Sequence, residues 1–340
     1  MKFDYYVLNT YVPEMDGAGP ELYHKWIEQV TLAEELGFDG AWFTEHHFGR
    51  FGGMLPSPQM LIGALAQHTQ RIRLGTAVVL LPMHHPLRIA EETAMLDILS
   101  DGRLQVGVGR GMGTQPFRIF GTDPDPVAAQ EKLEEQIEML VAAWTEAPFQ
   151  LDGKYYQCPN PITVLPRPLQ RPHPPVWVPT GRETVHSRWS GRHGFNLMTL
   201  PWLVGFETTR SVIGAYRAGL LEAGHAEEGC EVLAYLPAYV GETPESAREE
   251  SQEGWRRFRE VSDEERGSPN PNPLLYESLV AESRLIFGDP EECRQHIRRI
   301  CDEVQADRLA LLFHFGGIRQ DLVLASMRRF ATEVAPWFAE

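Results

Sequence analysis

The chain has 340 residues, with 31 Lys and Arg against 47 Asp and Glu, and its formal net charge is −16 at pH 7. This charge, without a basic block of five or more residues, disfavours binding to nucleic acid and to anionic membranes. No apolar run approaches the roughly 18 residues of a membrane span, and the N-terminus lacks a signal-like pattern. The composition therefore predicts a cytoplasmic protein without nucleic-acid or membrane partners.

The chain begins with a β-prone run at 3–8, which is followed by a loop rich in Pro and Gly. Apolar residues from Leu22 to Leu36 then recur at helical spacing, and Gly37 stands where a helix commonly ends. The same alternation of strands and helices continues, and residues 72–81 are almost all apolar, as in strands buried on both faces. The helices predicted along the chain are 22–36, 59–69, 87–99, 128–144, 184–193, 206–222, 245–260, 290–304 and 322–338.

Eight strands are predicted, and almost every one is followed by a helix. Eight β/α units are typical of a closed parallel (β/α)8 TIM barrel. A doubly wound open sheet is the alternative, but the GxGxxG signature expected after its first strand is absent after Leu8. We expect one domain over 1–340 with insertions at about 148–175 and 244–285, the second including a polar loop from 263 to 273. The predicted strands are 3–8, 40–44, 72–81, 103–109, 176–180, 196–200, 231–240 and 308–315.

In such a barrel the reacting groups follow the C-terminal ends of the strands. Glu45, His46 and His47 follow the second strand, and carboxylate with imidazole could bind zinc or iron. Neighbouring side chains of an extended backbone point to opposite faces, however, so only one of the two histidines can easily face the mouth. That histidine is a general acid or base or a structural hydrogen-bonding residue. The four cysteines follow no CxxC spacing and indicate neither a zinc site nor disulfides: Cys158, Cys230, Cys293 and Cys301.

Two glycine-containing turns indicate a phosphate site. The segment 107–113 holds four glycines and Arg110, so its backbone can approach a ligand closely and its guanidinium can bind an anion. Gly181, Arg182 and Thr184 open a helix after the fifth strand, where free N–H groups and the helix dipole favour phosphate. Together the two turns predict a mononucleotide cofactor or a phosphorylated substrate.

Several motifs resemble those of the bacterial luciferase-like, flavin-dependent monooxygenases, and they occur in the family's order. The resemblance covers most of the chain and is weakest over about 144–175 and 241–280. The motifs are Glu45-His46-His47-Phe48 with Phe51-Gly52, residues 75–82, residues 85–91, Leu99-Ser-Asp-Gly-Arg103, Gly109-Arg110-Gly111, residues 117–122 and residues 288–293.

The resemblance implies a (β/α)8 barrel that binds reduced FMN, reacts with O2 and transfers one oxygen atom to a small organic substrate. It also implies a separate NAD(P)H-dependent flavin reductase and a homodimer or higher oligomer, paired through helices flanking strands two and three. His46 matches the catalytic histidine, and Ala77-Val78 match a bulge where a non-proline cis peptide often lies against the flavin. Arg110 matches a phosphate-binding arginine and Met112 a position beside the ring, while Gly181, Arg182 and Thr184 fall in the phosphate-binding turn.

The chain departs from bacterial luciferase at two positions. Gly109 stands where luciferase has a reactive cysteine, and Gly113 where it has an aromatic residue. We therefore do not expect light emission on a long aldehyde. Two alternatives stay open: a hydride-transfer oxidoreductase that uses deazaflavin, as relatives in the superfamily do, and a non-catalytic flavin-binding subunit, which His46 argues against. The two insertions are expected to form the substrate pocket walls.

Overall fold

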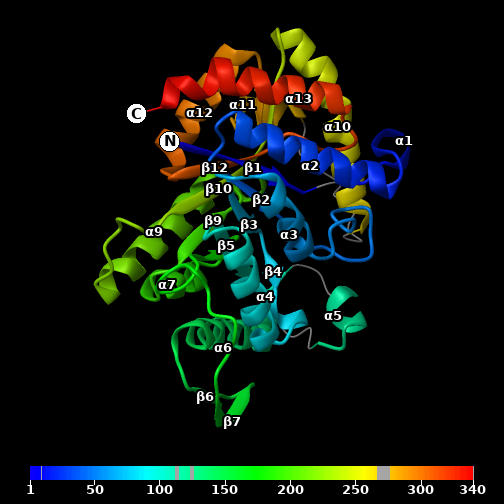
Figure 1. The fold of residues 1–340 in the computed structure, drawn as a ribbon. Coiled ribbons are helices and arrows are strands. Elements are labelled where there is room, and N and C mark those ends of the chain that lie inside the picture. The colour runs from blue at the N-terminus through cyan, green and yellow to red at the C-terminus, as the bar shows by residue number, and fades with distance from the viewer. Residues whose placement is uncertain (9, 112–114, 123–125, 266–275, 340) are drawn as a thin grey trace.

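The computed structural model describes residues 1–8, 10–111, 115–122, 126–265 and 276–339. Parallel strands form a central barrel, and helices surround it (Figure 1). The barrel strands are β1 (Lys2–Val7), β2 (Gly40–Phe43), β3 (Arg73–Thr76), β5 (Leu104–Gly109), β8 (Val176–Pro179), β9 (Asn196–Thr199), β10 (Val232–Val240) and β12 (Arg308–Leu312).

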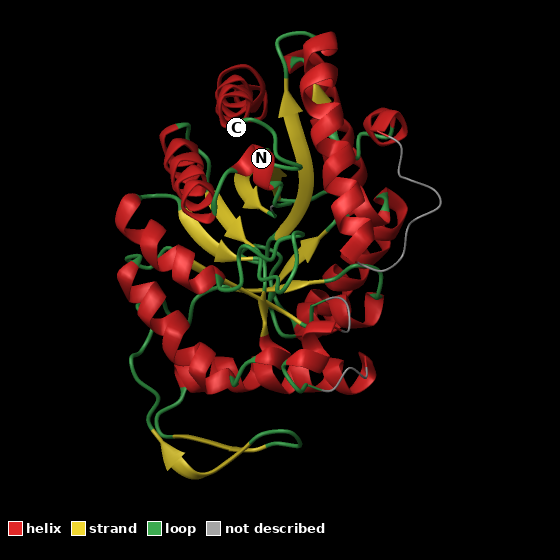
Figure 2. Ribbon diagram, turned by 90° about the vertical axis from the view of Figure 1, so that its right-hand side faces the viewer, coloured by secondary structure: helices red, strands yellow, loops and turns green. Residues whose placement is uncertain are grey.

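The sheet closes on itself. Strand β1 pairs with β2 on one side and with β12 on the other, and β10 joins β12 to β9. Leu233 of β10 lies opposite Met198 in one pairing and opposite Arg308 in the other. The ring can be followed in Figure 2. The predicted (β/α)8 barrel is therefore confirmed, and the open sheet is wrong.

Helices cover the outside of the barrel, and none in the described part of the chain has the length and apolar character needed to cross a membrane. The helix predicted at 322–338 changes type, because α13 ends at Arg329, a π-helical turn follows at Phe330–Val334, and a 3-10 turn ends at Phe338. The longer helices are α2 (Gly19–Glu35), α3 (Pro58–His68), α4 (Pro86–Leu99), α6 (Pro126–Thr145), α7 (Thr184–Arg192), α9 (Phe206–Ala223), α10 (Pro244–Glu265), α12 (Pro290–Val304) and α13 (Gln320–Arg329).

Three further segments differ from the sequence-based expectation. The strand predicted at 72–81 divides into β3 and β4 (Val79–Leu80), with a cis peptide bond between Ala77 and Val78. The first insertion contains an antiparallel hairpin, β6 (Phe149–Asp152) and β7 (Gln157–Ile162), which projects from the barrel. In the second insertion α10 continues to Glu265, so the helix includes the start of the predicted polar loop; residues 266–273 of that loop lie outside the described residues. A short helix, α11 (Tyr276–Ala281), and strand β11 (Ile286–Gly288) follow.

That residues 1–340 form one domain stays a prediction.

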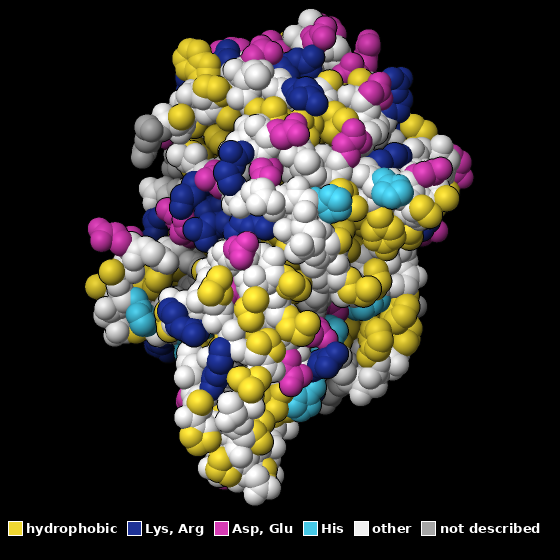
Figure 3. Space-filling view, in the orientation of Figure 1, with side chains coloured by type: hydrophobic (Ala, Val, Ile, Leu, Met, Phe, Trp, Pro, Cys, Tyr) yellow, Lys and Arg dark blue, Asp and Glu magenta, His cyan; other side chains and the backbone are white. Residues whose placement is uncertain are grey.

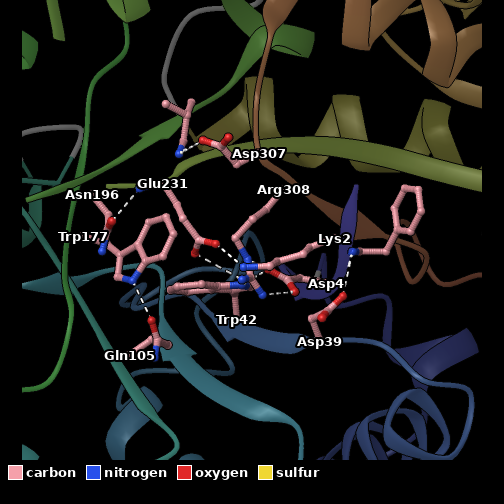
Figure 4. Close-up of polar contacts among 12 residues, drawn as sticks. Lys2, Asp4, Asp39, Trp42, Gln105, Trp177, Asn196, Glu231, Asp307 and Arg308 are labelled. Atoms are coloured by element: carbon pink, nitrogen blue, oxygen red, sulfur yellow. Dashed lines mark hydrogen bonds and ion pairs between the residues drawn. The ribbon is translucent and has the colours of Figure 1, made fainter. Parts of the chain in front are cut away.

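The floor of the barrel, at the N-terminal ends of its strands, is a buried polar network (Figure 4). Asp4 accepts hydrogen bonds from Trp42 Nε1 at 2.8 Å, from Arg308 Nε at 2.8 Å and from Arg308 Nη2 at 2.7 Å. Arg308 also contacts Glu231, at 3.2 Å. Burial opposes the charge of Arg308, but Asp4 and Glu231 outweigh burial and raise its pKa. The network is thus a compensated buried ion pair at the end of the barrel that serves stability.

We expect Asp4→Asn to destabilise the protein by about 3–5 kcal/mol, because the variant removes the fully buried one of the two carboxylates that compensate the buried guanidinium of Arg308. Urea unfolding followed by circular dichroism measures this loss. Lys2→Gln is the matched control, since Lys2 pairs with Glu231 in the same network but its side chain is 50% exposed. Its removal should cost about 1 kcal/mol or less. Equal losses for both variants would contradict the assignment.

Candidate active site

The sequence-predicted site residues follow the C-terminal ends of four neighbouring strands. His46 follows β2, Ala77 and Val78 lie between β3 and β4, Arg110 follows β5, and the 181–184 turn joins β8 to α7. The barrel order β2-β3-β5-β8 makes these strands consecutive. The fold therefore brings the described candidates to one sector of the barrel mouth, whereas Met112 lies outside the described residues.

A buried carboxylate organises one side of this sector. The Glu45 side chain is fully buried, and its Oε1 lies 3.0 Å from His47 Nε2 and 2.8 Å from His84 Nε2. Its Oε2 accepts a hydrogen bond from the backbone N–H of Leu80 at 2.9 Å. Glu45 therefore joins the loop after β2 to strand β4 and to the loop after it.

The charges of this cluster support one another. Burial opposes ionisation of Glu45, but hydrogen bonds from His47 and His84, the charge of His84 and the Leu80 N–H outweigh burial and lower the pKa of Glu45. Burial likewise opposes protonation of His84, yet the hydrogen bond and charge of Glu45, with the charge of Glu92, raise the pKa of His84 above its usual 6.5. An imidazole of this kind can exchange protons near neutral pH.

His46 contacts different partners from His47. Its ring lies edge-on to Phe51, with 5.5 Å between ring centroids, and a Cβ atom on Gly52 would lie 2.7 Å from His46 Cγ. Gly52 has φ +75°, so both its conformation and this close approach favour glycine. Phe51 in turn packs against Phe258 of α10 at 5.4 Å. His46 thus lies beside an aromatic wall.

The turn after β8 has the features of an anion site. Gly181 and Arg182 are exposed, and a Cβ on Gly181 would meet no atom within 4 Å. No side chain of the described residues caps α7 at Glu183, so N–H groups of its first turn are available to a ligand. Thr180 Oγ1 is buried without a hydrogen-bond partner. These residues fit the phosphate group of a mononucleotide.

Glycines of β5 let neighbouring segments approach closely. A Cβ on Gly107 would lie 2.0 Å from the carbonyl oxygen of Thr76, and one on Gly109 would lie 2.7 Å from Val78 Cγ2. A side chain at Gly109 would therefore require the side chains of Val78 and Pro179 to shift.

Two polar residues of the site were not predicted from the sequence. His84 follows strand β4, and its place after a strand end was the available signal. Gln136 of α6 carries no such signal; its Nε2 donates to the carbonyls of Leu81 and His84 and to the hydroxyl of Tyr156 in the hairpin insertion. Among the residues that the structure describes, no group of three or more His, Cys, Asp or Glu side chains could hold a metal ion.

Comparisons with known proteins identify the family and the fold. The family model described as luciferase-like monooxygenase matches residues 1–307. The oxygenase component of flavin-dependent trigonelline monooxygenase from Acinetobacter baylyi is 28% identical over an alignment of 342 positions, gaps included, that covers 94% of this chain and 91% of that protein. A monooxygenase from Streptomyces bottropensis has a TM-score of 0.93 at 28% identity, with 100% of both chains covered.

One further solved structure resembles the chain in fold alone. A secondary alcohol dehydrogenase that depends on coenzyme F420 has a TM-score of 0.78 at 18% identity and covers 100% of this chain and 99% of its own. The family match over residues 1–307, the closed barrel and the relatives named as monooxygenases lead to one conclusion. The chain belongs to the luciferase-like monooxygenase family.

Proposed function

We propose that the protein is a cytoplasmic oxygenase component that uses reduced FMN, supplied by a separate NAD(P)H-dependent reductase, and O2 to oxygenate a small organic substrate. One observation carries the proposal: His46, the Ala77-Val78 segment, Arg110 and the phosphate-like turn at 181–184 follow four consecutive strands at one end of the barrel. The relative named as the oxygenase component of a flavin-dependent monooxygenase supports the separate reductase.

The residues for the cofactor divide by chemistry. Gly181, Arg182 and Thr184 would hold the phosphate with Arg110, while Ala77-Val78, with Met112, would contact the ring. Bound reduced FMN would supply the electrons that activate O2. The protein supplies orientation and limits the access of water, since closed surroundings suppress loss of the oxidising equivalent to hydrogen peroxide.

Two histidines are proposed for proton control. His46 would hold or move a proton at the reacting atoms, as imidazole side chains do in many enzymes. His84 would act as a positioning residue, because Glu45 holds its Nε2 and links it to the backbone of Leu80. The non-catalytic subunit alternative leaves His46 without a role.

Hydride transfer with deazaflavin remains the second candidate, because an F420-dependent enzyme has the same fold. Anaerobic titration with reduced FMN and reduced F420, followed by mixing with 18O2, separates the two. We expect tighter binding of reduced FMN and, with a substrate, 18O in the product.

His46→Ala should retain FMN affinity within about threefold and lose turnover by about 100-fold or more, the contribution of a proton-transfer group. Preference for F420 without 18O transfer would support hydride transfer, and unchanged turnover of His46→Ala would remove that residue's role.

Glu45→Gln should lower the pKa of His84 relative to the wild type, because a neutral amide cannot stabilise the imidazolium and only the charge of Glu92 then opposes burial. In the wild type the raised pKa of His84 stabilises the fold below about pH 6.5, and this stabilisation is lost as the pH rises through the raised pKa. NMR titration of the histidine rings measures the shift. His296, which contacts Ser283 instead of Glu45, is the internal control. An unchanged His84 pKa would contradict the coupling.

We propose that two copies of the chain pair through α3 and α4. Figure 3 shows apolar side chains on the face where these helices lie, interspersed with charged ones. Met60 is 79% exposed and Met95 52%. Met60→Lys with Met95→Lys should convert the oligomer to a monomer in sedimentation velocity, since the charges would be buried in the interface. Leu221→Lys is the control, because Leu221 is 81% exposed on α9. A wild-type monomer would refute the interface.

A further inference from the structure

The inward side of α10 carries buried polar atoms that lack partners. Among the described residues, eight buried side-chain polar atoms have no hydrogen-bond partner, and four of the eight belong to this helix: Trp255 Nε1, Arg259 Nε, Arg259 Nη1 and Ser262 Oγ. Positions 255, 259 and 262 are four and three residues apart, so they form one stripe along the helix. Such a concentration of unpaired donors on one stripe indicates an acceptor that binds there.

Stability alone does not explain Arg259. Its side chain is 9% exposed, and its described hydrogen bond is from Nη2 to Asp263 Oδ1 at 2.9 Å. Asp263 balances the charge, but two guanidinium nitrogens remain buried without acceptors. Unpaired buried donors oppose folding, because their lost hydration is not repaid. A residue that is unfavourable in the free protein and adjoins a functional site is expected to serve a ligand.

The C-terminal part of α10 lies at the barrel mouth. Glu265 accepts a hydrogen bond from the backbone N–H of Phe51 at 3.1 Å, and Figure 1 shows the end of α10 beside the loop after β2. Phe258 packs on Phe51 at 5.4 Å and on Trp202 at 6.2 Å. The aromatic wall that begins beside His46 therefore reaches Phe258, which stacks on Trp255 and lies four residues before Ser262, on the same side of α10.

We propose that Arg259, with Ser262, binds the carboxylate of an organic acid whose apolar body lies beside Phe51 and Trp202, the two rings of the aromatic wall that keep some accessible surface. The inference rests on the proposed function, because this acid would be the compound oxygenated near His46. A carboxylate offers acceptors only and pairs strongly with guanidinium. Since Asp263 already faces Arg259, a singly charged anion suits the stripe better than a phosphate dianion.

The test uses equilibrium binding and thus needs no turnover. Benzoate, cinnamate and cyclohexanecarboxylate are each compared with the corresponding neutral amide by quenching of tryptophan fluorescence, with and without FMN. We expect at least one acid to bind the wild type about tenfold or more tightly than its amide. Arg259→Met should remove this preference, and Arg259→Lys should retain part of it because the charge remains.

Two controls separate ligand binding from a structural role. Arg256→Met removes an arginine from the same helix, but Arg256 is 54% exposed and pairs with Glu253, so the acid preference should persist. The melting temperature of Arg259→Met without ligand should equal or exceed that of the wild type, because two unpaired buried donors are removed. FMN affinity should not change in either variant.

Three results would overturn the inference: no acid preferred over its amide by the wild type, a preference that survives Arg259→Met, or a melting temperature lowered by several degrees in both Arg259 variants. An ordered water on the stripe would give the first result. If acids bind through Arg259 but no 18O transfer from reduced FMN occurs with any acid, the proposed function fails and the carboxylate site stands. If neutral compounds are oxygenated equally by the wild type and Arg259→Met, only the carboxylate site fails.

Discussion

Closure of the parallel sheet is the constraint on which the site depends. Because β10 pairs with both β9 and β12, the strands form a ring, and their C-terminal ends all reach the same rim. Residues that are far apart in sequence, such as His46 and Thr184, therefore follow strands that end at the same rim. Loops after the strands can vary there, while the strands hold their starting points fixed.

Buried polar groups are hydrogen-bonded at the floor of the barrel, whereas some polar atoms buried near the mouth have no partner. At the floor, Arg308 makes three hydrogen bonds to two carboxylates, and Trp42 donates to one of them. At the mouth, Thr180 and Arg259 keep buried polar atoms unpaired. A satisfied network stabilises and fixes a fold, whereas unpaired groups lower stability and are retained where a ligand completes them. The contrast fits a protein whose binding chemistry is confined to one end.

Glu45 shows how the mouth is held together. Glu45 belongs to the loop after β2, yet its carboxylate forms hydrogen bonds with His84 and with the backbone N–H of Leu80, which belong to the next β/α unit. Gln136 extends these contacts to Tyr156 at the tip of the first insertion. The second insertion is joined to the loop after β2 by Glu265, which accepts a hydrogen bond from the backbone N–H of Phe51. The insertions are therefore bonded to the same loops that carry the candidate residues.

The sequence by itself determined the barrel and the candidate loops. Apolar runs such as 72–81 and the helical spacing of 22–36 depend on local periodicity, which burial on one or two faces imposes on any sequence of this fold. The motif around His46 and the glycines near Arg110 are also local in sequence, so the resemblance to the family was sufficient to predict them as site segments. Tertiary structure alone decided which groups meet. One partner of Glu45, His84, lies 39 residues away, and the unpaired stripe of α10 is defined by what packs against it. Periodicity along one segment contains no information on such contacts, because they depend on how separate β/α units are oriented around the closed ring.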